Sequence, residues 1–157
     1  FHPGRDPERG PMVWSTGEGN GFTTGESWLA SAKAANRYSV ENQELEQDSM
    51  LHFYRRLLSL RKEDEVLRNG LCTFIDTSCM HILAYCREIG SDQRLILLNM
   101  SNKNQICSVP LVQTSAMQCE LIFSTEARSG QMDDLHAIQI GPFQGRIYRL
   151  LVKDSNL

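Results

Sequence analysis

The chain has 157 residues, of which 41% are hydrophobic and 22% charged, and its net charge is −3. This length fits one domain, or a small domain with part of another, and the composition is typical of globular proteins. The slightly negative charge argues against a nucleic-acid or acidic-membrane partner, and no apolar run approaches the roughly 20 residues that span a bilayer.

The chain opens with a charged segment rich in proline and glycine, in which Arg5 and Arg9 alternate with Asp6 and Glu8 before Trp14. Proline and glycine at this density rule out a long regular element, and charged loops of this kind usually serve a site. The segment has no initiator methionine before it. We therefore expect this chain to be the rear portion of a longer protein that holds the rest of the site.

Residues 1–47 are predicted to form a long irregular segment, because glycines and prolines punctuate it throughout. Trp14, Phe22 and Trp28 are spaced as anchors, and a flexible linker seldom carries so many aromatics. Long loops without secondary structure are usually functional or linkers. We expect this one to lie on a partner domain.

A helix is predicted over 48–63, with Asp48 or Ser49 as its N-cap. Apolar residues recur at helical spacing and form one stripe: Met50, Phe53, Tyr54, Leu57, Leu58 and Leu60. Such a stripe usually faces a core, although a partner-binding face is the alternative. Asn69 and Gly70 tolerate positive φ and are predicted to end the helical region.

After Gly70 the pattern changes to short apolar runs separated by turn-forming residues, which is typical of an antiparallel β-sandwich. Seven strands are expected, over Leu71–Ile75, Met80–Cys86, Arg94–Met100, Gln105–Val109, Met117–Phe123, Leu135–Ile140 and Arg146–Val152. The fold class is therefore mainly β with one long helix, and we place the domain boundary at 69/70.

Five cysteines without a CxxC pair argue against a disulfide framework or a zinc site. They read as buried reduced thiols, which favours a reducing compartment such as the cytoplasm. The four histidines are scattered along the sequence, so we expect no metal site and no cofactor.

The segment from Gly4 to Trp14 resembles the Arg-Asp-x-x-Arg-Thr-Pro-Met-Gln-Trp-Asp signature of α-glucosidases in the α-amylase superfamily, glycoside hydrolase family 13. The resemblance continues in the same order through further short motifs: Asn20-Gly21-Phe22, Trp28-Leu29, Val40-Glu41-x-Gln43, Tyr54-Arg55-x-Leu57, Leu60-Arg61-Lys62-Glu63 and Gly70, and loosely to Gly141-Pro142-Phe143. Three positions depart from the signature, where Gly10, Val13 and Ser15 replace Thr, Gln and Asp.

The resemblance implies a (β/α)₈ barrel followed by a β-sandwich domain. Residues 1–69 would be the last loop and eighth helix of the catalytic barrel, and 70–157 the C-terminal sandwich. The implied reaction is retaining hydrolysis of α-glucosidic bonds in short glucose oligosaccharides by an Asp nucleophile and a Glu acid/base. Those groups would precede Phe1, so the isolated chain would be inactive, and its partner would be the rest of the barrel.

In the family, the arginine that opens the signature points toward the innermost glucose and pairs with a carboxylate, which assigns substrate binding to Arg5. Arg9 is the second substrate-binding candidate, and pairing with Asp6 or Glu8 to hold the loop is its alternative. For Arg5 the alternative is a structural salt bridge. We interpret Trp14 and Phe22 either as residues that stack on a sugar face or as anchors for the packing of the loop.

Two other functions remain open from the sequence. One is a relative without catalytic groups that binds a partner, as transporter heavy chains do. The other is a sandwich that binds carbohydrate by itself. Against the second, the strand aromatics are dispersed and expected to fill a core: Phe74, Tyr85, Phe123, Phe143 and Tyr148.

Overall fold

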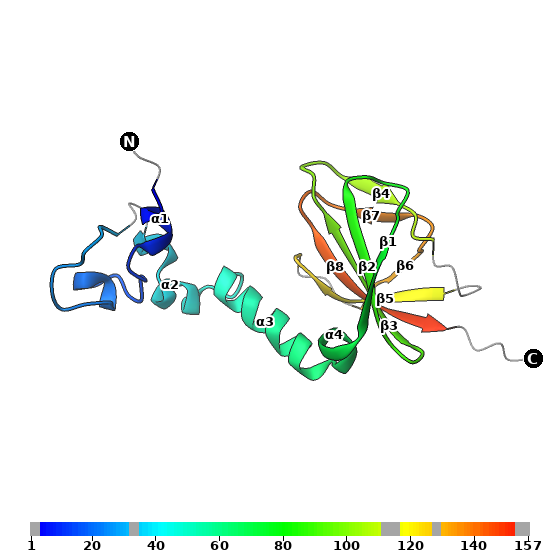
Figure 1. The fold of residues 1–157 in the computed structure, drawn as a ribbon, viewed down its shortest axis with the longest axis horizontal. Coiled ribbons are helices and arrows are strands. Elements are labelled where there is room, and N and C mark those ends of the chain that lie inside the picture. Colours follow the sequence, from blue (N-terminus) through cyan, green and yellow to red (C-terminus); the bar gives the residue numbers. More distant parts are fainter. Residues whose placement is uncertain (1–3, 32–34, 111–116, 127–129, 153–157) are drawn as a thin grey trace, which may run out of the picture. The chain divides into compact units, whose positions relative to one another are not determined.

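A computed structural model describes residues 4–31, 35–110, 117–126 and 130–152. The chain forms two compact units, residues 1–58 and 59–157. The described structure is mainly β and its strands pair antiparallel, which confirms that part of the predicted fold class (Figure 1). The predicted boundary at 69/70 stays a prediction.

The first unit contains short helices where the sequence predicted an irregular segment. They are α1 (Asp6–Arg9), the 3₁₀ turns η1 (Glu18–Gly21) and η2 (Ala35–Tyr38), and α2 (Val40–Leu45). The hydroxyl of Ser39, which is buried, accepts a hydrogen bond from Asn42 N at 3.2 Å and caps α2. The prediction was wrong for α2 because six residues are too few to show a helical apolar stripe.

The long helix is confirmed as α3 (Met50–Glu63). Ser49 precedes it, and its hydroxyl accepts a hydrogen bond from His52 N at 3.4 Å. None of the α3 side chains is buried, and Met50, Tyr54 and Leu58 are all more than half exposed. Phe53, Leu57 and Leu60 are half-buried, so the expectation that this stripe faces a core stays a prediction.

The helical region ends in a separate short helix, α4 (Glu65–Asn69), capped by Asp64, whose carboxylate accepts from Leu67 N at 3.1 Å. Gly70 follows with φ −59°, so the expected positive φ is not found. Glycine is needed for space instead, since a Cβ here would lie 2.5 Å from the Val66 carbonyl oxygen and 2.9 Å from Glu88 N.

The second unit contains a six-stranded sheet in the order β1-β2-β3-β8-β5-β6 and a two-stranded sheet of β4 and β7 (Figure 1). The strands are β1 (Leu71–Ile75), β2 (Ile82–Ile89), β3 (Asp92–Asn99), β4 (Gln105–Cys107), β5 (Met117–Ser124), β6 (Met132–Asp133), β7 (Ile138–Ile140) and β8 (Gly145–Val152). All seven predicted strands are present, β1 with the predicted ends and the other six with shifted ends. The two-residue β6 is too short to produce a periodic pattern.

One face of the large sheet and the small sheet share a hydrophobic core, to which β2, β3, β4, β5, β7 and β8 all contribute. Leu95, Leu97, Leu121 and Tyr148 are almost fully buried in it. Of the aromatics expected in the core, Tyr148 is there. Phe74 and Phe143 are 71% and 68% exposed, so the prediction was wrong for both.

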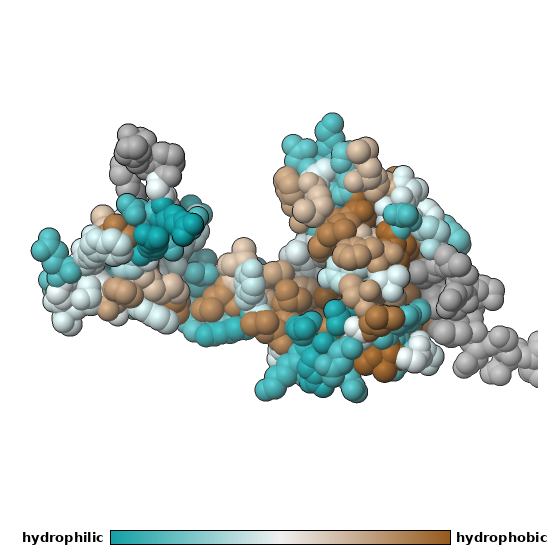
Figure 2. Space-filling model, viewed as in Figure 1, coloured by the Kyte–Doolittle hydropathy of each residue, from teal (hydrophilic) through white to brown (hydrophobic). Residues whose placement is uncertain are grey.

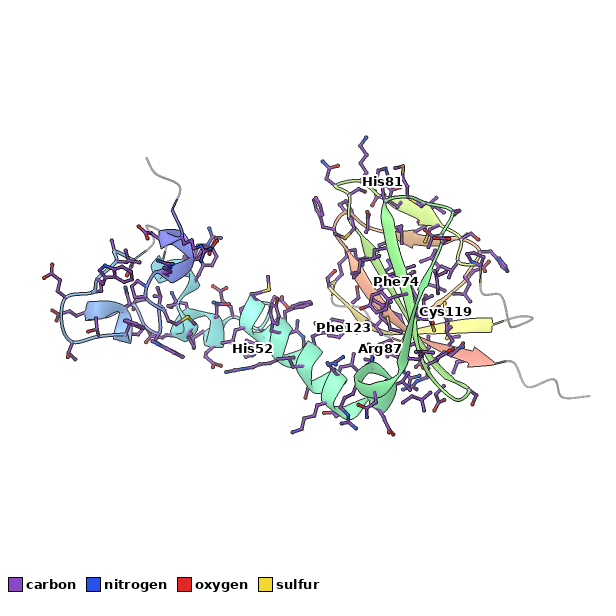
Figure 3. All side chains as sticks on the ribbon, in the orientation of Figure 1. His52, Phe74, His81, Arg87, Cys119 and Phe123 are labelled. Atoms are coloured by element: carbon purple, nitrogen blue, oxygen red, sulfur yellow. The ribbon has the colours of Figure 1, made fainter. Side chains whose placement is uncertain are left out.

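Helix α4 is tied to the opposite face of the sheet by two arginines. Arg87 on β2 donates to the carbonyl oxygens of Gly70 at 2.8 Å and Val66 at 3.3 Å (Figure 3). Arg94 on β3 donates from Nε to Asp64 Oδ2 at 2.6 Å. These bonds add to those from Gly70 N to the Val66 carbonyl oxygen and from Leu67 N to the Asp64 carboxylate, so both ends of α4 are held.

Candidate functional site

The arginine loop, residues 4–14, carries both predicted substrate-binding residues. Arg5 is the N-cap residue of α1 and Arg9 is its last residue. Both are exposed. In the described part of the chain neither guanidinium forms an ion pair, so the alternative pairing with Asp6 or Glu8 is not observed. The helix brings the two arginines within one turn of each other and leaves their donors available.

Backbone hydrogen bonds hold the end of the loop against α2. The carbonyl oxygens of Val13 and Trp14 accept from Val40 N and Glu41 N, both at 3.0 Å. The Glu41 carboxylate in turn accepts from Thr16 N at 3.1 Å. These bonds use the backbone of Val13 and the first turn of α2, so the side-chain departures from the family signature leave them intact.

A tight turn fixes the segment after Trp14. Asn20 and Gly21 have φ of 54° and 64°, and the Asn20 carbonyl oxygen accepts from both Trp14 N and Ser15 N. A Cβ on Gly21 would lie 2.9 Å from Ser15 Oγ. The side-chain amide of Asn20 also donates to Ser31 Oγ. The Asn-Gly pair therefore has a structural reason here, because positive φ is costly for most other residues.

The aromatic anchors of this unit are exposed. Trp14 and Phe22 are about half exposed, and Trp28 is 81% exposed. Large aromatics normally bury most of their surface, so these side chains are available for contact with another group. Figure 2 shows hydrophobic residues at the surface of this unit.

Sequence reasoning assigned no role to Gln43, which joins α2 to α3. Its Oε1 accepts from Leu51 N at 3.0 Å, its Nε2 donates to the Tyr38 carbonyl oxygen at 2.8 Å, and its own carbonyl oxygen accepts from Ser49 Oγ at 2.7 Å. Its position in the Val-Glu-x-Gln motif was the only signal for it. Glu44 adds a paired bond to Arg55, with both N–O distances at 2.6 Å.

In the second unit, buried charged side chains form two hydrogen-bonded networks. Asp64 pairs with Arg94, and although burial alone would raise the pKa of Asp64, the hydrogen bonds from Arg94 and from backbone N–H groups lower it. Asp133 accepts from Tyr148 Oη at 2.6 Å and from Arg146 Nη1 at 3.1 Å. Burial, together with the bond to Asp133, raises the pKa of Tyr148, although Arg146 opposes that change.

Burial also raises the pKa of the Cys86 and Cys119 thiols to about 11. They are therefore protonated at neutral pH, as expected for structural thiols. Among the described residues, no group of three or more His, Cys, Asp or Glu side chains is placed to hold a metal ion. In the same residues, no helix has both the length and the hydropathy of a membrane span.

The arginine loop can hold an acid and donate to hydroxyl groups at the same time. Arg5 and Arg9 each carry five N–H donors, and a guanidinium fork matches a carboxylate or a pair of neighbouring hydroxyls. The turn at Gly21 and the bonds to α2 fix the backbone behind Trp14. The loop therefore presents two guanidinium groups that can bind a carboxylate or hydroxyl groups.

Comparison with known proteins connects this loop to one family. The sequence model of the α-amylase catalytic domain matches residues 2–70. The chain is 27% identical over 153 residues to the oligo-1,6-glucosidase of Parageobacillus thermoglucosidasius and 28% identical over 148 residues to that of Bacillus cereus. These matches cover 96% and 94% of the chain and 26% of each relative, so the chain spans about a quarter of their length.

A solved structure agrees with these matches. The trehalulose synthase from Pseudomonas mesoacidophila MX-45 superposes with a TM-score of 0.81 at 25% identity, over 94% of this chain and 26% of that one. The domain match, the relatives and the shared fold support one conclusion. The chain is similar to the α-amylase superfamily, glycoside hydrolase family 13, and the matches support an α-glucosidase-like protein of that family.

Proposed function

We propose that this chain is the C-terminal portion of a retaining α-glucosidase that hydrolyses α-glucosidic bonds of short glucose oligosaccharides. The observation that carries the proposal is the match to oligo-1,6-glucosidases over nearly the whole chain but a quarter of their length. Residues 1–69 would complete a catalytic barrel and 70–157 would form its C-terminal β-domain. The catalytic carboxylates would belong to the rest of the barrel.

Within this enzyme, Arg5 would bind the sugar in the innermost subsite. Its guanidinium is exposed and unpaired among the described residues, so it is available to a carboxylate and to glucose hydroxyls. Such hydrogen bonds can strengthen as the sugar ring distorts toward the transition state. Arg9, one turn away on α1, would support the same subsite from the side.

The outer face of the six-stranded sheet is a second reason to propose another domain as the partner of this chain. Directly opposed residues on five neighbouring strands form the outer row, which consists of Phe74, Tyr85, Ile96, Ile147 and Phe123. Figure 3 labels its two ends, Phe74 on β1 and Phe123 on β5. The Phe74 and Tyr85 rings lie 6.0 Å apart, and Phe74 is largely exposed.

Charged residues lie beside the outer row on the same face of the sheet, so the apolar surface ends there. The next set of opposed residues along the strands is Arg87, Arg94 and Arg149, of which Arg87 and Arg94 bind α4. The sheet face is therefore covered by α4 at one end and apolar beside it, and Figure 2 shows hydrophobic residues gathered over this sheet. Phe74 is the exposed end of this row, exposed apolar residues can mark interfaces, and we assign its contact to the catalytic barrel.

The proposal is tested by assaying the 157-residue chain and the longer protein separately on maltose, isomaltose and p-nitrophenyl α-glucoside. Retaining hydrolysis needs two carboxyl groups about 5 Å apart across the bond. We expect the chain alone to release no glucose and the longer protein to release it. Turnover by the isolated chain would contradict this division of the active site.

In the longer protein, Arg5→Ala and Arg9→Ala separate the two arginines. We expect Arg5→Ala to lower kcat/KM by about 10²-fold or more, as removal of one charge-stabilising donor does, and mainly through kcat. Arg9→Ala should act mainly through KM. Equal, small effects of the two substitutions on KM alone would contradict the role of Arg5.

A further inference from the structure

Two of the five cysteines reach the same hydrophobic core from segments far apart in the sequence. Cys79 lies in the connection between β1 and β2, is half-buried and packs against the core of the second unit. Cys107 is the last residue of β4, is 1% exposed and belongs to that core. Both are thiols in the structure. Only the fold brings them to one place, because 27 other residues separate them in the chain.

Three hydrogen bonds join the two segments beside these thiols. Ser78 N donates to the Ser108 carbonyl oxygen at 3.3 Å, and Ser108 N donates to Ser78 Oγ at 2.9 Å. Cys79 Sγ donates to Gln105 Oε1 at 3.3 Å. As the first segment advances from 78 to 79, its contact in the second segment moves back from 108 to 105. The two segments therefore run antiparallel past each other.

Cys107 lies between these two contacts, so it stands across from Cys79. In an antiparallel pair, the residue after one opposed residue faces the residue before the other, with their Cα atoms about 4.5–5.5 Å apart. Disulfides join residues whose Cα atoms are about 4.4–6.8 Å apart. Gln105 and Cys107 also share one face of β4, because side chains two apart in a strand point the same way. The Cys79 thiol, bound to Gln105, therefore approaches the face that carries the Cys107 thiol.

Electrostatics agree with this placement. Burial raises the pKa of Cys107, and the nearby Cys79 raises it further, although Arg146 opposes that change.

The cysteines of β1 and β2 do not offer such a pair, although Cys72 also raises the pKa of Cys86. Cys72 is opposed to Arg87, which binds α4 on the outer face of the sheet, whereas Cys86 is opposed to Thr73 and is buried in the core. Because Arg87 and Cys86 are neighbours in one strand, their side chains point to opposite faces. The thiols of Cys72 and Cys86 therefore lie on different sides of the sheet.

We propose that Cys79 and Cys107 form a reversible disulfide that ties the β1–β2 connection to β4 when a soluble disulfide such as oxidised glutathione is present. Cys79, the more exposed of the two, attacks one sulfur of the oxidised glutathione and releases one glutathione. Cys107 then loses its proton and attacks Cys79 Sγ, which breaks the mixed disulfide and releases the second glutathione. Two protein thiols are oxidised, one external disulfide is reduced, and the two thiol protons end on the two glutathione molecules.

The buried Cys107 needs no reagent from solution in this sequence, because its reaction partner is the neighbouring Cys79 sulfur. The cross-link lies in the second unit and uses neither Arg5 nor any catalytic group. It therefore stands apart from the proposed hydrolytic function, and the failure of either proposal leaves the other in place.

The test is oxidation of the folded 157-residue chain with oxidised glutathione, followed by alkylation of the remaining thiols and peptide mapping by mass spectrometry. We expect one internal disulfide, and the linked peptides should fragment to place it at Cys79 and Cys107. The cross-link closes the chain from 79 to 107, so the oxidised chain should unfold at a temperature about 5 °C or more above that of the reduced chain. Dithiothreitol should restore both thiols and the lower unfolding temperature.

Two variants make the result decisive. Cys79→Ala removes one partner and leaves the buried Cys107 in the core, so it should form no internal disulfide and gain no stability on oxidation. Cys72→Ala removes an exposed cysteine of β1 and is the matched control, which should cross-link and gain stability as the wild type does. A different linked pair, no internal disulfide in the folded wild type, oxidation that stops at a glutathione adduct on Cys79, or equal cross-linking in the two variants would each overturn the proposal.

Discussion

The Arg94 guanidinium and the Asp64 carboxylate meet at 2.6 Å, and each side chain is about nine-tenths buried. Asp64 is also the N-cap of α4, and Arg94 lies on β3 in the middle of the six-stranded sheet. One ion pair thus attaches the last helix before the strands to the sheet that follows. This ion pair holds α4 against the outer face of the six-stranded sheet.

Removing one partner of this pair should destabilise the second unit strongly. We expect Arg94→Met to lower the free energy of unfolding by about 3 kcal/mol, because it leaves a buried carboxylate without its partner. Arg149→Met is the matched control, since Arg149 and Glu120 form an exposed pair at 3.4 Å and its loss should cost at most about 1 kcal/mol. Urea unfolding measures both, and equal losses would contradict the assignment.

The same pair predicts a pH dependence. The pKa of Asp64 lies below its ordinary value of 3.8 in the folded chain. The pair therefore stabilises the fold fully above that value, and this stabilisation is lost as the pH falls through the lowered pKa. Asp64→Asn keeps a capping side chain but cannot ionise. The stability gap between wild type and Asp64→Asn should be larger at pH 7 than in strong acid, and an equal gap at both would sink this explanation.

Gly70 should not tolerate a side chain, although its φ of −59° suits any residue. A Cβ would lie 2.5 Å from the Val66 carbonyl oxygen, which is backbone and cannot move aside. We expect Gly70→Ala to destabilise by about 2 kcal/mol or more. Gly10→Ala, with open space around its Cβ, is the control and should be nearly neutral in thermal unfolding.

The outer row should make the isolated chain associate with itself. Phe74 is its most exposed member, and exposed apolar patches favour association. We expect sedimentation velocity to show oligomers that grow with concentration, and Phe74→Lys to reduce them without changing the unfolding temperature. Lys103→Glu, an exposed change away from the row, should leave association as it was. A monomeric wild type at all concentrations would contradict this prediction.

Strands and the long helix were predictable because their signals are local. A short apolar run after Gly70 located β1 to its ends, Leu71 and Ile75, and the helical stripe located α3. The two-residue β6 and the six-residue α2 are too short to show the two-residue period of a strand or the 3.6-residue period of a helix. Gly70 was correctly singled out, but for the wrong reason, since its role depends on Val66 and Glu88 brought close by folding.

The candidate site was predictable only in part. Arg5 and Arg9 could be chosen from their motif, and the structure leaves both exposed. The acid and the sugar that we propose as their contacts would come from outside the described residues, so the motif is what singles these two arginines out.

The central claim is that these residues complete an α-glucosidase that retains configuration at the anomeric carbon. Proton NMR of the first product released from maltose or isomaltose by the longer protein tests it most directly. We predict that the α-anomer of glucose appears first and then mutarotates. Initial release of the β-anomer, or no hydrolysis by the longer protein at all, would contradict the account.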